Sequence, residues 1–259
     1  WANGQAYKGT KKRESLLGNM MLTYKKNWKK HFFDVLALAE LQKETYTGYY
    51  TTVSNFSTDK FGYNNLQAGA LRLWEGTNSY YEQPRLASFM GRFNYTYADR
   101  YVLTLNARTD ASSKFGANHK WGFFPSASAA WVISEEEFMK QFPVIDNLKF
   151  RIGYGLAGNQ SGIDSYTTLN LVKPNGVVPV GNSAIVSLGD LRNTNPDLKW
   201  ERRGKFNVGL DLTLFRTINL EVDYYNELTS DMIFEVPITL TTGLAYELRN
   251  MGKMRNRGI

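Results

Sequence analysis

The sequence of 259 residues contains no cysteine and only two histidines, His31 and His119, which stand far apart. Disulfide bonds, thiolate metal sites and cysteine nucleophiles are therefore excluded, and two lone histidines do not predict a metal site. No run of apolar residues approaches the roughly 18 that a transmembrane helix needs, and the N-terminus lacks the charged and apolar regions of a signal peptide. We therefore expect no metal and no cofactor, and Trp1 need not be the biological start of the protein.

Positive charge is in modest excess, with a formal net charge of +7. The basic residues do not form one stripe along the sequence, so a nucleic-acid partner is not predicted. They concentrate near the N-terminus, as KKRE at 11–14 and KKNWKK at 25–30. We expect both runs to be solvated turns.

Aromatic residues are abundant, with 16 tyrosines and 15 phenylalanines, and such residues favour β-strands. Apolar and polar residues alternate with a period of two in several segments, for example YVLTLNARTD at 101–110 and NLKFRIGYGLA at 147–157. The alternation predicts an all-β protein with antiparallel strands near residues 14–25, 31–46, 84–97, 100–111, 121–133, 147–157, 198–213 and 218–229.

The same alternation assigns side chains to two faces. We expect an apolar face that contacts lipid and contains Phe89, Phe93, Leu103, Leu105, Ile152, Leu210 and Val222. The opposite, polar face should line the lumen of a barrel with Arg92, Asn106, Arg151 and Asp211.

Loop lengths indicate the environment of this sheet, because a soluble all-β protein would alternate as well. The connections near 26–30, 98–99, 134–146 and 214–217 are mostly short, and those near 47–83, 112–120, 158–197 and after 230 are mostly long. The segment 134–146 is the one exception. Short turns at one end and long loops at the other are typical of outer-membrane barrels, so we expect the first set in the periplasm. Aromatic residues at strand ends suit interfacial girdles: Tyr95, Tyr97, Tyr101, Trp121, Phe123, Phe124 and Trp131.

A dinucleotide-binding turn is an alternative interpretation of residues 153–158, which have the spacing G-x-G-x-x-G. The following residues show no helical periodicity, and no acidic residue stands between Asp164 and Asp190, so the motif lacks its context. We expect Gly153 and Gly155 instead on the polar face of a strand, at a bulge, a bend or a closely packed neighbour.

Two further motifs could suggest catalysis. The S-x-x-E spacing from Ser134 to Glu137 predicts a capping box at the start of a short helix, rather than a set of catalytic carboxylates. Asp110, Ser112 and Ser113 have only His119 near them in sequence, which is weak ground for a catalytic triad. The stretch TDASSKFG at 109–116 better suits a turn-rich loop, and we expect that the protein is not an enzyme.

Several segments resemble one family. FMGRFNYTYADRYVLTLNARTDASSKFGANHKWGFFPSASAAWVISEEEFMK, LKFRIGYGLAGNQ, NPDLKWERRGKFNVGLDLTLF and TTGLAYELRNMGKMRNRGI are similar, in this order, to the later barrel of SusC/RagA-type TonB-dependent outer-membrane transporters of Bacteroidetes. The resemblance implies active import of a glycan, peptide or similar nutrient across the outer membrane. It also implies a SusD-like surface lipoprotein as a lid and energy supplied through TonB, ExbB and ExbD.

The resemblance further implies that residues 1–259 are part of a larger plugged barrel, with about eight strands here and the plug domain and other strands elsewhere. We expect the first and last strands not to pair with each other. A passive porin, a siderophore-type TonB-dependent receptor and, more remotely, a soluble β-rich binding domain remain alternatives.

Candidate substrate-binding residues follow from their position at the loop end of the polar face. Polar and charged candidates are Arg108, Asp110, Arg151, Asn159 and Gln160, and Trp200 could stack on a sugar ring. The alternative for each is ordinary packing in the lumen or in an aromatic girdle.

Overall fold

The computed structural model describes residues 4–259, which form strands joined by turns and by short 3-10 helices. None of the helices in this part of the chain is long and apolar enough to span a membrane. Nine strands follow one another across the main sheet: β1 (Gln5–Trp28), β2 (His31–Phe56), β5 (Arg85–Tyr97), β6 (Tyr101–Ser112), β7 (Trp121–Val132), β8 (Ile145–Asn159), β11 (Glu201–Leu214), β12 (Ile218–Ser230) and β15 (Lys253–Gly258). The six other described strands are β3 (Gly69–Leu71), β4 (Thr77–Glu82), β9 (Val172–Val180), β10 (Ser183–Asp190), β13 (Ile233–Pro237) and β14 (Tyr246–Asn250). The 3-10 helices are η1 (Gly62–Asn64), η2 (Leu66–Ala68), η3 (Trp74–Gly76), η4 (Ile133–Glu135), η5 (Glu137–Gln141) and η6 (Leu240–Thr242).

The chain divides into two units. The smaller unit contains Trp1–Leu17 and Gln42–Arg85, and the larger contains Gly18–Leu41 and Leu86–Ile259. In the smaller unit, β4 pairs with β2 antiparallel, with Thr47 opposite Tyr81, and β3 pairs with the end of β2. The prediction of a loop over 47–83 is therefore wrong at its start, because TGYYTTVSNF is rich in the β-branched and aromatic residues that continue a strand.

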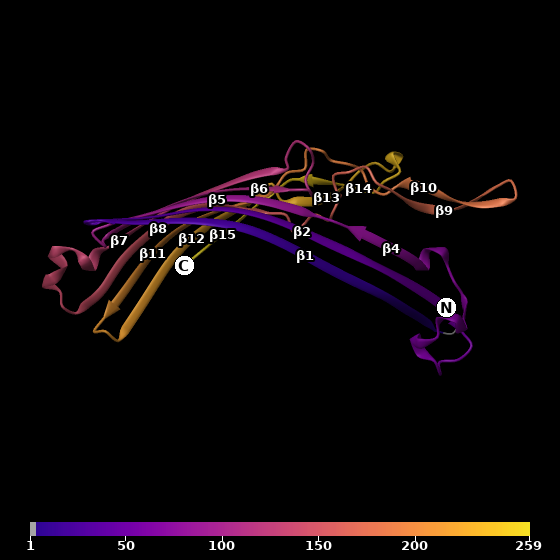
Figure 1. The fold of residues 1–259 in the computed structure, drawn as a ribbon, viewed down its shortest axis with the longest axis horizontal. Helices are drawn as coiled ribbons and strands as arrows, with labels where there is room; N and C mark the ends of the chain where they lie inside the picture. The colour runs from indigo at the N-terminus through magenta and orange to yellow at the C-terminus, as the bar shows by residue number, and fades with distance from the viewer. Residues whose placement is uncertain (1–3) are drawn as a thin grey trace. The chain divides into compact units, whose positions relative to one another are not determined.

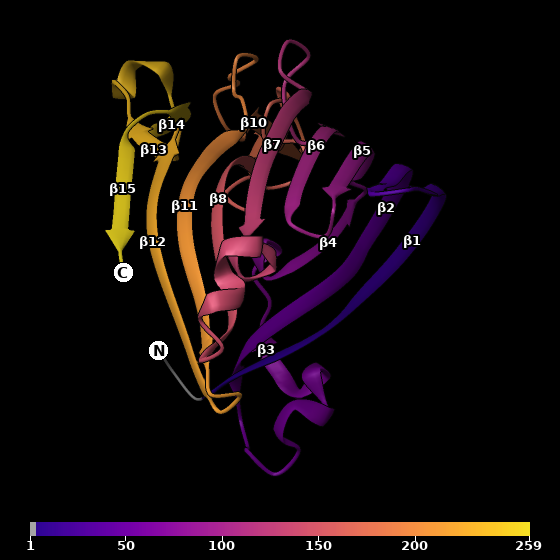
Figure 2. The same cartoon turned by 90° about the vertical axis from the view of Figure 1, so that its left-hand side faces the viewer.

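The larger unit is built on one sheet with the strand order β1-β2-β5-β6-β7-β8-β11-β12-β15. Figures 1 and 2 show these strands side by side. Among the described strands, β1 and β15 lie at the two ends of this order, which agrees with the expectation that the first and last strands do not pair. β15 adds a strand to this sheet beyond the eight that periodicity predicts, and β11 begins at Glu201 instead of 198.

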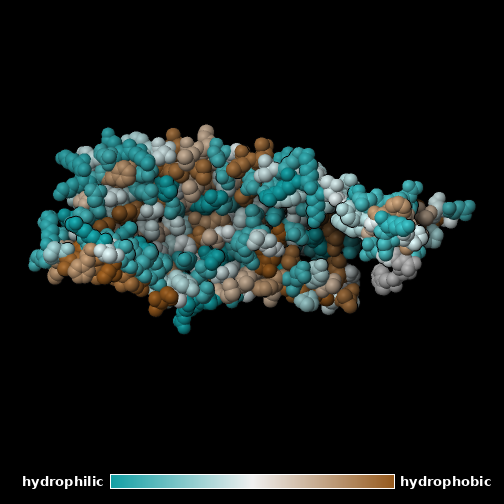
Figure 3. Space-filling model, turned by 90° about the horizontal axis from the view of Figure 1, so that it is seen from below, coloured by the Kyte–Doolittle hydropathy of each residue, from teal (hydrophilic) through white to brown (hydrophobic). Residues whose placement is uncertain are grey.

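The strand register agrees with the predicted faces. Phe93 pairs with Leu105, Ile152 with Val208, and Leu210 with both Phe150 and Val222. Directly opposite residues point to the same side of a sheet, so these apolar side chains share one face. Ile152 is 40% exposed and Leu105 is 42% exposed, so no second layer of described residues buries this face. In Figure 3, hydrophobic and hydrophilic residues are interspersed on the face in view instead of forming one apolar surface.

The glycines of the G-x-G-x-x-G motif are explained by close packing. The pairing of β8 with β7 and with β11 runs without a shift through Gly153 and Gly155, so there is no bulge there. A Cβ on Gly153 would lie 3.2 Å from Cβ of Ser128, and one on Gly155 would lie 2.9 Å from Cβ of Ser126. The serines on β7 therefore leave little room for side chains at these two positions of β8.

The short connections of the larger unit lie together at one end of its strands, at the left-hand side of Figure 1 and facing the viewer in Figure 2. This end is called the short-turn rim. The turns begin with residues of positive φ, such as Lys29 at 54°, Ala98 at 52° and Phe215 at 53°. Backbone N–H groups join neighbouring turns: that of Ala98 donates to the carbonyl oxygen of Lys30 at 2.7 Å, and that of Phe215 to the carbonyl oxygen of Val144 at 3.1 Å.

The basic runs differ from the prediction in part. KKNWKK includes the tight turn between β1 and β2, as expected, but KKRE lies inside β1. There Arg13 Nη2 lies 2.6 Å from Glu44 Oε1, and Lys12 pairs with Glu14. KKRE is thus part of a strand, and Arg13 has its carboxylate partner on the neighbouring strand β2.

The predicted capping box is wrong. Ser134 lies inside η4, and neither Val132 nor Glu136, which precede η4 and η5, makes a side-chain capping bond. The carboxylate of Glu136 instead accepts hydrogen bonds from Tyr101 Oη at 2.6 Å and Trp131 Nε1 at 3.1 Å. It also accepts one from Arg100 Nη1 at 2.9 Å. These three partners come from the neighbouring strand ends, so tertiary contacts replace the local cap.

This arrangement predicts a pH-dependent turn. Hydrogen bonds from Tyr101 and Trp131, aided by Arg100, lower the pKa of Glu136 below its ordinary value of about 4.3. A lowered folded-state pKa means that the stabilisation is complete above the ordinary value and is lost as pH falls through the lowered one. Hydrogen exchange over residues 133–144, corrected for intrinsic rates, should therefore quicken as pH falls from the ordinary value through the lowered pKa of Glu136.

The control for this prediction is the neighbouring carboxylate. Glu136→Gln should speed exchange at neutral pH and remove the pH dependence, whereas Glu135→Gln should change neither. Equal behaviour of the two variants would mean that Glu136 does not hold the turn.

Candidate functional site

A cavity of about 620 Å³ opens where β5, β6, β7 and β8 approach the long connections. It brings together five of the six predicted substrate-binding residues, and Arg151 alone lies outside it. The lining includes the polar residues Asn106, Arg108, Asp110, Lys114, Ser126, Asn159, Gln160 and Ser161, and the apolar residues Leu86, Met90, Phe124, Leu156 and Trp200.

Arg108 and Asp110 form a fixed pair on one wall. They are two residues apart on β6 and so point to the same side of the sheet. Arg108 Nε donates to both carboxylate oxygens of Asp110 at 2.9 Å, and Nη2 donates to Ser88 Oγ at 3.1 Å. Asp110 is 7% exposed, and Ser88, directly opposite it on β5, is 1% exposed. The pair therefore presents an oriented, nearly neutral polar wall instead of a free cation.

Asn159 and Gln160 differ in their partners. Asn159 Nδ2 donates to Glu201 Oε2 at 2.6 Å, and its Oδ1 accepts from the Ser161 backbone at 3.0 Å and hydroxyl at 2.7 Å. The Oε1 atom of Gln160 is buried and has no hydrogen-bond partner among the described residues. A buried acceptor without a partner costs about 1–3 kcal/mol, so an N–H or O–H donor entering the cavity would relieve this cost.

Trp200 lines the cavity and is held in place by its packing and by a hydrogen bond. It is 5% exposed, and its Nε1 donates to the carbonyl oxygen of Lys120 at 3.1 Å. Its ring centroid lies 4.6 Å from that of Phe115 and 5.6 Å from that of Phe124, the latter edge-on. Together with Ile163 and Leu198 these rings form a buried cluster, called the loop core. Stacking of Trp200 on a sugar ring stays an untested prediction.

Phe124 was assigned by sequence to the aromatic girdle, and this assignment is wrong. It is 5% exposed, lines the cavity and packs so closely that a Cβ on Gly122 or Gly158 would clash with its ring. Strand periodicity could have found this, because Phe124 has the opposite parity to its girdle neighbours Trp121 and Phe123. Lys114 was also missed; its Nζ donates to the carbonyl oxygen of Ile163 at 2.8 Å, a contact between distant loops.

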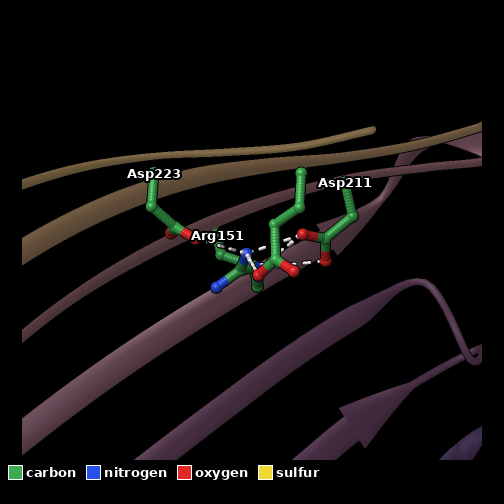
Figure 4. Close-up of polar contacts among 4 residues, drawn as sticks. Arg151, Asp211 and Asp223 are labelled. Atoms are coloured by element: carbon green, nitrogen blue, oxygen red, sulfur yellow. Dashed lines mark hydrogen bonds and ion pairs between the residues drawn. The ribbon is translucent and has the colours of Figure 1, made fainter. Parts of the chain in front are cut away.

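Arg151 lies apart from the cavity in a charged cluster formed by β8, β11 and β12. Figure 4 shows its guanidinium between Asp211 and Asp223. Nη2 lies 2.6 Å from Asp211 Oδ1, 2.8 Å from Glu221 Oε1 and 3.3 Å from Asp223 Oδ2. One positive and three negative groups leave a formal charge of −2. Arg151 is therefore engaged in a network within the sheet, and its contact with substrate stays a prediction.

No group of three or more side chains that could hold a metal ion occurs among residues 4–259. The cavity also shows no set of nucleophile, base and acid.

The match with known proteins covers nearly the whole chain. Residues 2–259 match the family described as TonB dependent receptor-like, beta-barrel. The chain belongs to this family. It is 36% identical over 245 residues to the TonB-dependent receptor P3 of Formosa agariphila, covering 93% of this chain and 24% of that protein. It is 33% identical over 186 residues to the TonB-dependent receptor SusC of Bacteroides thetaiotaomicron, covering 70% of this chain and 18% of SusC.

Solved structures agree. The chain matches the RagAB peptide importer in its closed-closed state with a TM-score of 0.77 and 26% identity, over 98% of this chain and 27% of that one. The prediction of a SusC/RagA-type outer-membrane β-barrel is thereby confirmed, and the relatives are receptors and transporters, not enzymes. The chain spans about a quarter of the length of these relatives.

Proposed function

We propose that these residues form part of the barrel of an active importer in the outer membrane. The importer takes up a glycan, peptide or similar nutrient, draws energy through TonB, ExbB and ExbD, and works with a SusD-like surface lipoprotein. The plug domain and the other barrel strands lie in sequence outside residues 1–259. Membership of the TonB-dependent receptor family and the similarity to SusC and to the RagAB importer support this proposal.

Substrate contact is proposed at the cavity, and the observation that carries this assignment is the unpartnered Gln160 Oε1 beside the oriented Arg108–Asp110 pair. A ligand with N–H or O–H donors, such as a peptide or a sugar, satisfies this acceptor. Apolar residues of the same cavity, such as Leu86 and Met90, can contact a less polar part of this ligand.

The test uses Gln160→Leu in the full-length protein. Loss of one hydrogen bond to substrate, worth about 0.5–1.5 kcal/mol, should weaken the apparent affinity for the imported nutrient by roughly two- to tenfold. The affinity is measured by uptake in cells that depend on this protein for a labelled nutrient. Gln141→Leu, on η5 at the short-turn rim, is the matched control and should import normally. Unchanged affinity in Gln160→Leu would place substrate contact elsewhere.

Passive diffusion through the barrel is the competing mechanism. Deletion of TonB from the same cells separates the two, because an active importer then loses concentrative uptake while a porin does not. Uptake that survives this deletion would contradict the proposed energy coupling. The assignment of substrate contact to the cavity would then be decided by the Gln160→Leu variant alone.

A further inference from the structure

The run KKNWKK at the β1–β2 turn is left unexplained by the transport function. The turn consists of Lys29 and Lys30, with Lys29 at a φ of 54°, a conformation that asparagine and glycine adopt more readily than lysine. Lys26, Lys29 and Lys30 are all exposed. Turn geometry therefore does not explain why lysine stands here.

The other basic residues of the short-turn rim are paired with carboxylates. Arg100 lies 2.9 Å from Glu136, Lys140 lies 2.7 Å from Glu137, and Arg216 lies 3.6 Å from Asp146. Beside the β1–β2 turn, Nζ of Lys25 lies 3.8 Å from Oδ2 of Asp34, the one such pair of this turn among residues 4–259.

By contrast, Lys26, Lys29 and Lys30 form no ion pair with any carboxylate in the described part of the chain. They leave three positive charges together without internal compensation. The site therefore has charge available for an anionic partner.

The same turn carries an apolar anchor on the lipid-facing side. The indole ring of Trp28 is 62% exposed, and its centroid lies 5.7 Å from that of His31. His31 in turn lies 5.0 Å from Tyr97, which has the parity of the apolar face. By strand alternation Lys26 shares the face of Trp28. An amphipathic aromatic side chain beside ammonium groups is the arrangement found where a protein meets lipid headgroups.

An apolar groove lies farther along this face, away from the turn. Met20 and Leu22, which are 76% and 72% exposed, line it together with Ala37, Ala39, Phe89 and Gly91. Leu22, Lys26 and Trp28 have the same parity on β1, so the groove and the ammonium groups lie on one surface. Positive charge at the rim followed by an apolar channel fits a molecule with an anionic head and a hydrocarbon tail.

We propose that the β1–β2 turn is a binding site for an anionic phospholipid. Lys26, Lys29 and Lys30 bind the headgroup phosphate, Trp28 lies at the level of the headgroup, and an acyl chain follows the groove past Leu22. An acidic protein would satisfy the charges but would leave the apolar groove on the same face empty, which is why a lipid is the occupant. The site depends on the outer-membrane location of the family and not on the proposed transport.

The experiment is native mass spectrometry of the detergent-purified full-length protein titrated with phosphatidylglycerol or phosphatidylcholine. The variant is Lys26→Gln, Lys29→Asn, Lys30→Gln, in which asparagine keeps the positive φ of the turn. The matched control, Lys8→Gln, Lys11→Gln, Lys12→Gln, removes the same charge earlier in β1.

Wild type and control should retain phosphatidylglycerol in preference to phosphatidylcholine, and this preference should weaken at high salt. The variant should bind phosphatidylglycerol roughly tenfold more weakly or worse, with phosphatidylcholine binding unchanged. Retained preference in the variant, or an equal loss in the control, would overturn the proposed site. An unchanged melting temperature in detergent shows that the variant is folded.

Discussion

Replacing Ile152 with arginine should destabilise the assembled barrel by roughly 2–4 kcal/mol, the cost of arginine on the lipid face near the bilayer midplane. Ile152 stands at the middle of β8, pairs with Val208 on β11 and Ala129 on β7, and is 40% exposed in the described structure. Since no second layer among residues 4–259 covers it, we expect lipid to be the environment of this side chain. A guanidinium placed there loses its hydration without gaining a partner.

The measurement is denaturant unfolding of the full-length protein in phosphatidylcholine vesicles, followed by tryptophan fluorescence and by heat-modifiable migration in gels. Asn207→Arg is the matched control, because Asn207 lies on the adjacent strand, opposite Gly153, on the polar face. It should cost far less, since the lumen supplies water and the nearby carboxylates of the Arg151 cluster. If both variants were equally tolerated, Ile152 would not face lipid, and the assignment of the two faces would fail.

The faces of the sheet could be predicted because each is encoded locally. In β8 every second residue from Leu148 to Leu156 is apolar, and a period of two fixes the side to which each side chain points. Pairing then only joins faces that are already defined, as in Ile152 with Val208. Gly153 and Gly155 could be placed on the polar face by the same rule, although the serines that require them are known only from the register.

The loop core could not be predicted, because its contacts join distant parts of the sequence. Phe115 follows β6, Ile163 follows β8, and Trp200 precedes β11, yet the three are buried together. Nothing in the local pattern of any one loop indicates its partners in the others. The candidate cavity was therefore predictable as a location at the loop end of the polar face, whereas its walls depend on this long-range packing.

A local rule failed where partners from other strands replaced the local one. The carboxylate of Glu136 accepts hydrogen bonds from Tyr101, Trp131 and Arg100, and no side-chain cap forms at the start of η4 or η5. The S-x-x-E spacing was a suitable local signal, and tertiary contacts decided the result.

Removing the β9–β10 hairpin should abolish most uptake while leaving the barrel inserted. This hairpin, residues 172–190, pairs only with itself among the described strands and exposes apolar side chains, with Val172 59%, Ile185 49% and Leu188 67% exposed. An isolated two-stranded hairpin is marginally stable in water, and an exposed apolar patch of this kind marks an interaction surface. We expect the hairpin to contact the lipoprotein lid or the loops of the remaining barrel.

The ends of the hairpin permit a clean deletion. The backbone N–H of Leu191 donates to the carbonyl oxygen of Leu171 at 2.8 Å, so a short Gly-Ser link can replace residues 172–190 without moving the flanking chain. Ile163 and Leu198 of the loop core, and the strands β8 and β11, keep their partners. The amount of folded protein in the outer membrane should therefore equal that of wild type, since no lipid-facing strand is altered.

The decisive comparison is between this deletion and the point variant Leu188→Asp, which keeps the hairpin but places a charge in its most exposed apolar side chain. Both variants should lower nutrient uptake and the amount of surface lipoprotein that is recovered with the purified barrel. The deletion should lower both by roughly tenfold or more, because burial of one large apolar side chain at an interface contributes about 1.5–3 kcal/mol and the deletion removes several such side chains. Shortening the tip of the β13–β14 hairpin at 239–243, which lies outside the apolar patch, should leave lipoprotein recovery intact. Normal uptake and normal lipoprotein recovery after the deletion would show that the exposed apolar face of the hairpin has no partner in the working importer.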